Sequence, residues 1–275
     1  MKHSFASLAL LTATVFLSFP LLQSEAAPTS KQSFAQWCQQ KDSLAAETKT
    51  TVEVLLKQAG TQDCKLADET LNSQAQINLS RTQISDLQPL ASFKNLVGLN
   101  LSRNQISDIR PLAGLTNLIA LDLTKNQISD VKPLTGLSNL SELVLARNQI
   151  KDVKPLTVLT NLSFLNLSRN QIKDLKPLTS LTKLTYLRLD GNQISDVNVL
   201  EGLISLTWLD LSKNQISDVK PLASLTKLTY LGISNNQVSN VKHLERLTTL
   251  VGLDLDSNKI SEKVCPIKPE STCRF

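Results

Sequence analysis

Two pairs of carboxylates are the residues of this chain whose spacing could support catalysis. Asp190 and Asp210 lie 20 residues apart, and Asp254 and Asp256 alternate within one short segment. Glycosidases use two carboxylates about 5 to 9 Å apart, one of them with a raised pKa. On an open surface we expect such acids to be solvated, with nothing to raise one pKa. His243 has no partner in sequence, so we predict no catalytic residue, no enzyme activity and no cofactor.

Aromatic residues recur at one phase of four consecutive 22-residue units. These residues are Phe164, Tyr186, Trp208 and Tyr230. If the units place them on neighbouring strands, the rings form one exposed ridge beside Arg188, Asp190 and Asp210. Exposed aromatic side chains flanked by charges are typical of a partner-binding surface. The alternative is that the rings only stabilise the sheet by stacking on one another.

A row of basic residues lies at a second phase of the unit. Its members are Arg81, Arg103, Lys125, Arg147, Arg169 and Lys213. Such a row could attract acidic partners or anionic glycans, but a solvated rim is the commoner explanation and is the one we favour. The formal net charge of +5 is mild and contains no block of like charge. We therefore predict that nucleic acid is not a partner.

The elements that position these columns are copies of a 22-residue unit. One asparagine marks each copy: Asn104, Asn126, Asn148, Asn170, Asn192, Asn214, Asn236 and Asn258. Thr82 holds the same phase one unit earlier, and one unit reads Leu118-x-x-Leu121-x-Leu123-x-x-Asn126-x-Ile128. This pattern is the leucine-rich-repeat signature. We expect the asparagines to form a structural ladder that satisfies backbone groups where the chain leaves each strand.

Each unit is expected to contain one short strand and one helical turn. Residues 120–124 alternate with period two and predict a parallel strand. The segment 129–134 carries Asp130 and Pro133, which suit the start of a 3₁₀ turn. Capping explains the recurring aspartate without calcium, so we predict no metal. The fold class is α/β, a right-handed leucine-rich-repeat solenoid with a concave parallel β-sheet and convex 3₁₀ turns.

The chain divides into four predicted segments. Residues 1–26 resemble a signal peptide, because Lys2 and His3 precede a short apolar run. A membrane anchor is the alternative, but the run is interrupted at Ser18 and Pro20 and is short for a span of about 20 residues. Residues 27–75 are expected to form an N-terminal cap, with one or two helices between positions 33 and 59. Residues 76–260 form nine repeats, and residues 261–275 form a C-terminal cap. The mature chain is expected to be secreted or periplasmic, with no membrane span.

The four cysteines flank the repeats, Cys38 and Cys64 before them and Cys265 and Cys273 after them. Four cysteines allow three pairings. Nine strands at about 4.8 Å each would hold the two ends roughly 40 Å apart. Only Cys38–Cys64 and Cys265–Cys273 can then form disulfides, which exclude a shared metal site.

The unit Asn-Gln-Ile-Ser-Asp-Val-Lys-Pro-Leu resembles the 22-residue repeat class of bacterial internalins, which a regulator of nuclear protein phosphatase one shares. The resemblance covers residues 76–260 and implies adhesins that bind a protein through an aromatic concave face. This chain departs from internalins in lacking an immunoglobulin-like domain after the repeats and a wall-sorting motif. The sequence thus predicts an exported, monomeric, non-enzymatic recognition module that binds a protein ligand on its concave face. Glycan binding by the aromatic ridge is the alternative, and a purely structural envelope role is a third possibility.

Overall fold

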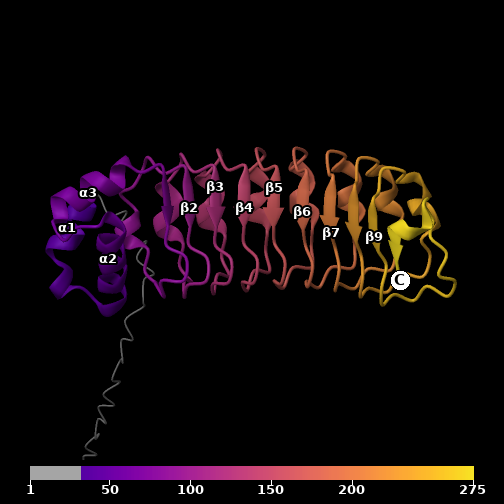
Figure 1. Ribbon diagram of the computed structural model, residues 1–275, viewed down its shortest axis with the longest axis horizontal. Coiled ribbons are helices and arrows are strands. Elements are labelled where there is room, and N and C mark those ends of the chain that lie inside the picture. Colours follow the sequence, from indigo (N-terminus) through magenta and orange to yellow (C-terminus); the bar gives the residue numbers. More distant parts are fainter. Residues whose placement is uncertain (1–31) are drawn as a thin grey trace, which may run out of the picture.

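The computed structural model describes residues 32–275, so the predicted signal peptide lies outside the described residues. The repeats stack side by side into an elongated solenoid, with helices at the N-terminal end and the C-terminus at the other end (Figure 1). One face of the stack is a single parallel sheet, and the opposite side carries 3₁₀ helices. The predicted leucine-rich-repeat solenoid is confirmed.

The sheet contains ten strands that pair in chain order. The strands are β1 Gln76–Asn78, β2 Gly98–Asn100, β3 Ala120–Asp122, β4 Glu142–Val144, β5 Phe164–Asn166, β6 Tyr186–Arg188, β7 Trp208–Asp210, β8 Tyr230–Gly232, β9 Gly252–Asp254 and β10 Cys273–Arg274. From β1 to β9 the partner of each residue lies 22 positions along the chain, as in the pair Leu99 and Leu121. Equivalent positions of the repeats therefore form straight columns across the sheet.

The alternation of side chains along each strand follows from burial. Leu121 is buried in the core, whereas Ala120 and Asp122 on either side of it are partly exposed on the open face. Strand β3 ends at Asp122, two residues earlier than the predicted end, but the backbone N–H of Leu123 still donates to Val144 O at 2.8 Å. Pairing between neighbouring repeats thus continues beyond the strand itself.

Short 3₁₀ helices return the chain along the convex side. They are η2 Gln88–Leu90, η3 Arg110–Gly114, η4 Lys132–Gly136, η5 Lys154–Val158, η6 Lys176–Ser180, η7 Asn198–Gly202, η8 Lys220–Ser224 and η9 Lys242–Arg246. The Asp130 carboxylate accepts a hydrogen bond from the Lys132 N–H at 2.8 Å at the start of η4. The aspartate row thus accepts from a free N–H at the start of each helix, as expected, although each aspartate lies one residue before the N-cap position. The helix η7 forms without proline, and the Asp196 carboxylate accepts a hydrogen bond from the Asn198 N–H at 2.9 Å.

The asparagine ladder joins each repeat to the one before it. Asn148 Nδ2 donates to Leu123 O and Leu145 O at 3.0 Å, and Asn148 Oδ1 accepts from the Ile128 N–H at 3.0 Å. Leu123 and Ile128 belong to the preceding unit. Each buried amide therefore binds backbone of its own turn and of its neighbour's, which fixes the stacking of the repeats.

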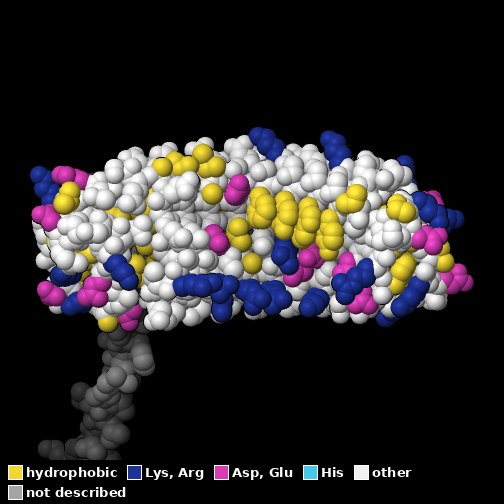
Figure 2. Space-filling model, in the orientation of Figure 1, with side chains coloured by type: hydrophobic (Ala, Val, Ile, Leu, Met, Phe, Trp, Pro, Cys, Tyr) yellow, Lys and Arg dark blue, Asp and Glu magenta, His cyan; other side chains and the backbone are white. Residues whose placement is uncertain are grey.

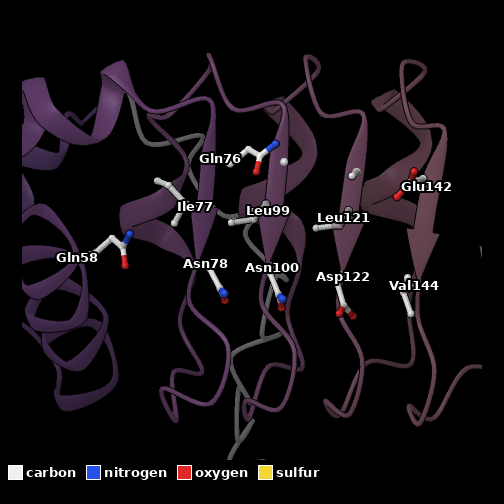
Figure 3. A pocket seen from close by; sticks show the side chains of 12 residues that line it. Gln58, Gln76, Ile77, Asn78, Leu99, Asn100, Leu121, Asp122, Glu142 and Val144 are labelled. Atoms are coloured by element: carbon white, nitrogen blue, oxygen red, sulfur yellow. The ribbon is translucent and has the colours of Figure 1, made fainter.

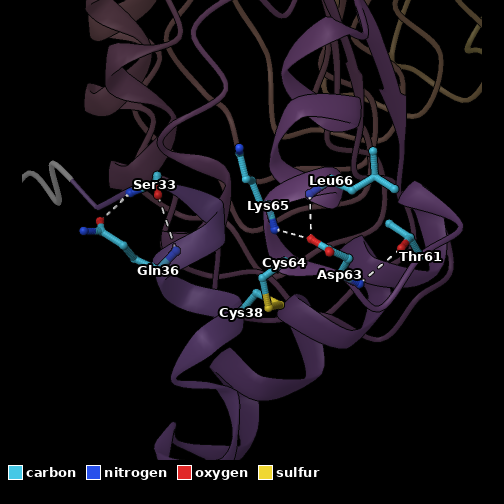
Figure 4. The surroundings of a disulfide bond; sticks show 8 residues. All are labelled: Ser33, Gln36, Cys38, Thr61, Asp63, Cys64, Lys65 and Leu66. Atoms are coloured by element: carbon cyan, nitrogen blue, oxygen red, sulfur yellow. Dashed lines mark hydrogen bonds between the residues drawn. A yellow bond between two sulfur atoms is a disulfide. The ribbon is translucent and has the colours of Figure 1, made fainter.

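The N-terminal cap consists of α1 Phe34–Gln39, η1 Lys41–Ser43, α2 Ala46–Ala59 and α3 Cys64–Ser73. Helix α2 ends at Gly60, whose φ of 71° requires a residue that tolerates the left-handed region. Helix α3, capped by Asp63, was not expected from the sequence, which predicted helix only as far as residue 59. The Cys38–Cys64 disulfide ties α1 to α3 with a Cα–Cα distance of 5.5 Å (Figure 4).

The C-terminal cap closes the other end of the sheet. A disulfide joins Cys265 to Cys273 with a Cα–Cα distance of 5.7 Å, the pairing expected from the separation of the chain ends. The short 3₁₀ helix η10 Glu270–Thr272 leads into β10, which pairs with β9 and so covers its free edge. None of the helices in residues 32–275 has the length and apolar character needed to cross a membrane.

Candidate functional site

The most distinctive surface of the molecule is a ridge of four stacked aromatic rings on strands β5 to β8. We call this surface the aromatic ridge: Phe164, Tyr186, Trp208 and Tyr230. Successive ring centroids lie 4.1, 4.3 and 4.9 Å apart, with interplanar angles of 6°, 9° and 15°. Figure 2 shows a run of hydrophobic side chains across the middle of the open face at these strands.

The parallel register produces this stack directly. Phe164 pairs with Tyr186, Tyr186 with Trp208, and Trp208 with Tyr230, so every ring projects from the same column. Because the rings lie nearly face to face, Tyr186 and Trp208 are covered on both faces, whereas Phe164 and Tyr230 at the ends of the ridge each have a ring against one face only. At the end of the ridge a methyl group on Gly252 would lie 3.0 Å from Tyr230 Cδ2. Glycine therefore leaves room for the last ring against the sheet.

A charged cluster lies beside the aromatic ridge. Arg188 Nε donates to Asp190 Oδ1 at 2.6 Å and lies 3.7 Å from Asp210 Oδ2. The guanidinium carbon of Arg188 lies 6.0 Å from the centroid of the Trp208 ring, within the range of a cation–π contact. The sequence-predicted site residues are thus brought together into one surface.

The expectation that the acids of this face are solvated is wrong for Asp190 and Asp210. Asp190 is 6% exposed and Asp210 is 8% exposed. Burial raises the pKa of Asp210, although hydrogen bonding to Ser212 acts in the opposite direction. The Asp210 carboxylate accepts from the Ser212 N–H at 3.0 Å, so it also closes the turn that follows β7. Packing of Arg188 and the neighbouring rings, which the sequence does not show, removes these acids from water.

The two buried carboxylates form an ion-pair cluster with Arg188. Arg188 lies between Asp190 and Asp210 and interacts with both. A Cβ atom on Gly232 would lie 2.8 Å from Asp210 Oδ1 and 3.1 Å from Tyr230 Oη, so only glycine leaves this position open. The Tyr230 phenol can donate a hydrogen bond at neutral pH, as any tyrosine can, and burial raises its pKa further above the ordinary value of about 10. The cluster can therefore recognise polar groups of a partner next to the aromatic ridge.

A shallow hollow of about 480 Å³ lies on the same face, over strands β1 to β4 (Figure 3). The aromatic column continues here as Gln76, Gly98, Ala120 and Glu142, and Gln58 of α2 contributes to the lining. The small residues Gly98 and Ala120 leave the sheet uncovered. The hollow was not expected from the sequence, although the change from small to aromatic residues along one column was its signal. The concave face thus joins a depression to a raised ridge.

The remaining sequence candidates lie elsewhere. The basic row lies at the edge of the concave face, where its side chains are exposed. His243 is exposed within η9 on the convex side. In residues 32–275, no group of three or more histidine, cysteine, aspartate or glutamate side chains has an arrangement that could hold a metal ion.

The repeats match the family model described as Leucine Rich repeats (2 copies) over residues 76–114, 116–158, 160–202 and 204–246. No curated protein sequence matches the chain. Several solved structures are similar to it. An internalin, InlF, from Listeria monocytogenes shares 35% identity at a TM-score of 0.70, with 75% of this chain and 62% of that chain covered.

Two further structures extend the comparison. Internalin C2 from Listeria monocytogenes shares 34% identity at a TM-score of 0.70, covering 75% of this chain and 92% of that chain. A leucine-rich-repeat protein of Leptospira interrogans shares 29% identity at a TM-score of 0.59, covering 75% of this chain and 61% of that one. The chain spans about three fifths of InlF. It belongs to the leucine-rich-repeat family and is a bacterial internalin-like member.

Proposed function

We propose that this internalin-like protein is an exported, monomeric, non-enzymatic recognition module that binds a protein ligand through its concave face. The leucine-rich-repeat fold is in general a protein-interaction scaffold, and internalin-type proteins are generally not enzymes. The observation that carries the proposal is the aromatic ridge with its charged cluster. Four partly exposed rings and an ion pair between the partly exposed Arg188 and the buried Asp190 occupy adjacent columns of one open sheet.

The geometry of the aromatic ridge favours an anchor for a protein surface. Aromatic side chains dominate the energetics of protein interfaces because they bury large areas with few rotatable bonds. Stacking at 4.1 to 4.9 Å already restricts the rings before any partner binds. Less side-chain entropy is therefore lost on association.

The same geometry limits sugar stacking on the ridge to the outer faces of Phe164 and Tyr230. A sugar ring that stacks on an aromatic side chain needs a free aromatic face. The faces of Tyr186 and Trp208 are covered by neighbouring rings on both sides, so their edges are what a ligand meets. The depression over β1 to β4 adds a second, complementary element for a protein surface with a protrusion.

Export is supported by the two disulfides that close the caps. Disulfides form and persist in oxidising compartments outside the cytosol. The described residues contain no free cysteine. A secreted or periplasmic location is therefore part of the proposal. Fractionation of the native host, followed by non-reducing peptide mapping of Cys38 with Cys64, tests it.

The central test replaces Tyr186 and Trp208 together by serine. Loss of two interface aromatics is expected to weaken binding by roughly 2 kcal/mol or more, about thirtyfold. The thermal midpoint should change little, because these side chains lie on the open face outside the leucine core. The change in binding is measured by affinity capture from cell-surface extracts, followed by titration calorimetry with the captured protein. The change in thermal midpoint is measured by calorimetric melting.

The matched control replaces Ala120 and Glu142 by serine in the same column of the sheet. It should capture the same protein with unchanged affinity. The proposal is contradicted if the aromatic double variant binds normally once folded at low temperature, because the ridge would then be a stabilising stack only. The carbohydrate alternative would instead be supported if the wild type binds a glycan array, and if the aromatic double variant loses this glycan binding but keeps its protein binding. The molar mass of the free protein, measured by light scattering, tests whether it is a monomer.

A further inference from the structure

A second surface runs along one edge of the concave face. We define the basic rim as the basic residues of five consecutive repeats: Arg81, Arg103, Lys125, Arg147 and Arg169. All five side chains are exposed. Figure 2 shows an unbroken row of lysine and arginine side chains below the open face, along the N-terminal half of the repeats. The aromatic ridge occupies the later repeats, so the two surfaces overlap only at the fifth repeat.

The backbone holds the basic rim as a straight row. The Arg103 N–H donates to Thr124 O at 2.7 Å, and the Lys125 N–H donates to Ala146 O at 2.8 Å. These bonds continue the pairing of adjacent repeats past the ends of the strands. Neighbouring residues of the rim are therefore separated by the strand spacing of about 4.8 Å. The row presents one charge per repeat at a regular interval.

The local conformation of the repeat opposes basic residues at this position. The five residues have φ between 53° and 60°, in the left-handed region that favours glycine and asparagine. Later repeats carry Gly191, Lys213, Asn235 and Ser257 at the same position, with φ of 69°, 57°, 54° and 56°. The fold therefore accommodates smaller residues here. A run of arginine and lysine is not explained by the needs of the backbone.

The charges of the basic rim are not neutralised within the protein. None of the salt bridges among residues 32–275 includes a member of the rim. In the same five repeats, the two outward columns of the sheet carry only the carboxylates of Asp122 and Glu142. The Asp122 carboxylate accepts a hydrogen bond from the Thr124 N–H at 2.8 Å. A positive potential therefore accumulates along this edge.

We propose that the basic rim binds a linear anionic polysaccharide, carboxylated or sulfated, that lies along the axis of the solenoid. Arginine guanidinium groups match carboxylate and sulfate oxygens through paired hydrogen bonds. The residues two positions after Arg103 and Lys125, Gln105 and Gln127, are also exposed, and their amides can bind the neutral hydroxyl groups of sugars. Regular charges next to hydrogen-bonding amides match a polymer that alternates acidic and hydroxyl groups.

Two other polyanions fit the rim less well. An extended acidic peptide places side chains on one face only every second residue, about 6.6 Å apart, which does not match the spacing of about 4.8 Å. Single-stranded nucleic acid is bound by basic grooves with aromatic platforms for the bases. Of the two outward strand columns, the one nearer the first four members of the rim contains Asn78, Asn100, Asp122 and Val144, and neither this column nor the next, of Gln76, Gly98, Ala120 and Glu142, contains an aromatic residue. The proposal is independent of protein binding by the aromatic ridge.

The test replaces Arg103, Lys125 and Arg147 together by asparagine. Asparagine is well tolerated in the left-handed conformation, so folding should be maintained. The matched control replaces Lys132, Lys154 and Lys176 by asparagine, which removes the same charge from exposed positions on the convex side. Heparin oligosaccharides and polygalacturonate are the sulfated and carboxylated probes, and dextran is the neutral probe. Binding is measured by calorimetry over a range of salt concentrations.

We expect the wild type to bind at least one anionic probe and not dextran, with affinity that falls as salt rises. The rim variant should lose roughly tenfold or more in affinity and show a shallower salt dependence. The control variant, and the variant with Tyr186 and Trp208 replaced by serine, should bind the anionic probe as the wild type does. The proposal is overturned if neither anionic probe binds, if the rim variant keeps full affinity, or if the control loses as much. Tighter binding of polyglutamate or single-stranded DNA than of both polysaccharides would also overturn it.

Discussion

Replacement of Asn148 by leucine tests how the ladder holds the repeats together. Asn148 lies in the middle of the stack and is 9% exposed. Its side chain makes hydrogen bonds to three backbone carbonyls and accepts one from the Ile128 N–H at 3.0 Å. Leucine has a similar shape and can make none of these bonds.

The cost follows from which backbone groups retain a partner. Leu123 O keeps the bond from Asn126 Nδ2 at 3.0 Å, and Leu145 O keeps the bond from Asn170 Nδ2 at 3.0 Å. The third carbonyl, of Ala146, keeps the Lys125 N–H at 2.8 Å. Only the Ile128 N–H is left without a partner. One buried orphan donor corresponds to a loss of about 1 to 3 kcal/mol in the free energy of unfolding.

The control is Thr82→Val at the first position of the ladder. Thr82 Oγ1 donates to Leu79 O at 2.8 Å, but Asn104 Nδ2 donates to the same carbonyl at 2.8 Å. This substitution therefore leaves no backbone group without a partner, and the expected loss is below about 1 kcal/mol. Urea unfolding at constant slope measures both values. If both substitutions lower the free energy of unfolding equally, the unpaired Ile128 N–H does not explain the contribution of the ladder.

Two further predictions concern the cap and the buried acid. Replacing Cys38 and Cys64 by serine opens a loop of sequence separation 26 and should lower the free energy of unfolding by roughly 3 kcal/mol. Amide hydrogen exchange should increase first in the N-terminal repeats. A uniform increase in exchange along the solenoid would contradict this prediction. The raised pKa of Asp210 means that its contribution to stability is fully present below the ordinary pKa of about 3.9 and is lost as pH rises through the higher folded-state value. Asp210→Asn keeps an acceptor for the Ser212 N–H but cannot ionise. The melting temperature of the variant minus that of the wild type should therefore increase from acidic to neutral pH. A difference in melting temperature that does not change with pH would contradict the burial argument.

The sequence by itself determined the architecture because every unit repeats the same local environment. A period of 22 places the neighbours of each residue at a constant separation, so the columns of Phe164 to Tyr230 and the buried position of Leu121 could be predicted before any packing was known. The same regularity separates the chain ends, which leaves Cys38 near Cys64 and Cys265 near Cys273.

Tertiary structure decided the properties that depend on side-chain packing between columns. The burial of Asp190 and Asp210 results from the position of Arg188 and the adjoining rings, and no spacing rule contains that information. The left-handed conformation of the basic rim follows from pairing with the next repeat rather than from the residues, which disfavour it. The caps lie outside the repeat, so α3 and β10 were not expected from the periodicity. Periodicity specifies which residues are neighbours, whereas burial, electrostatics and backbone conformation at the surface are set by how those neighbours pack.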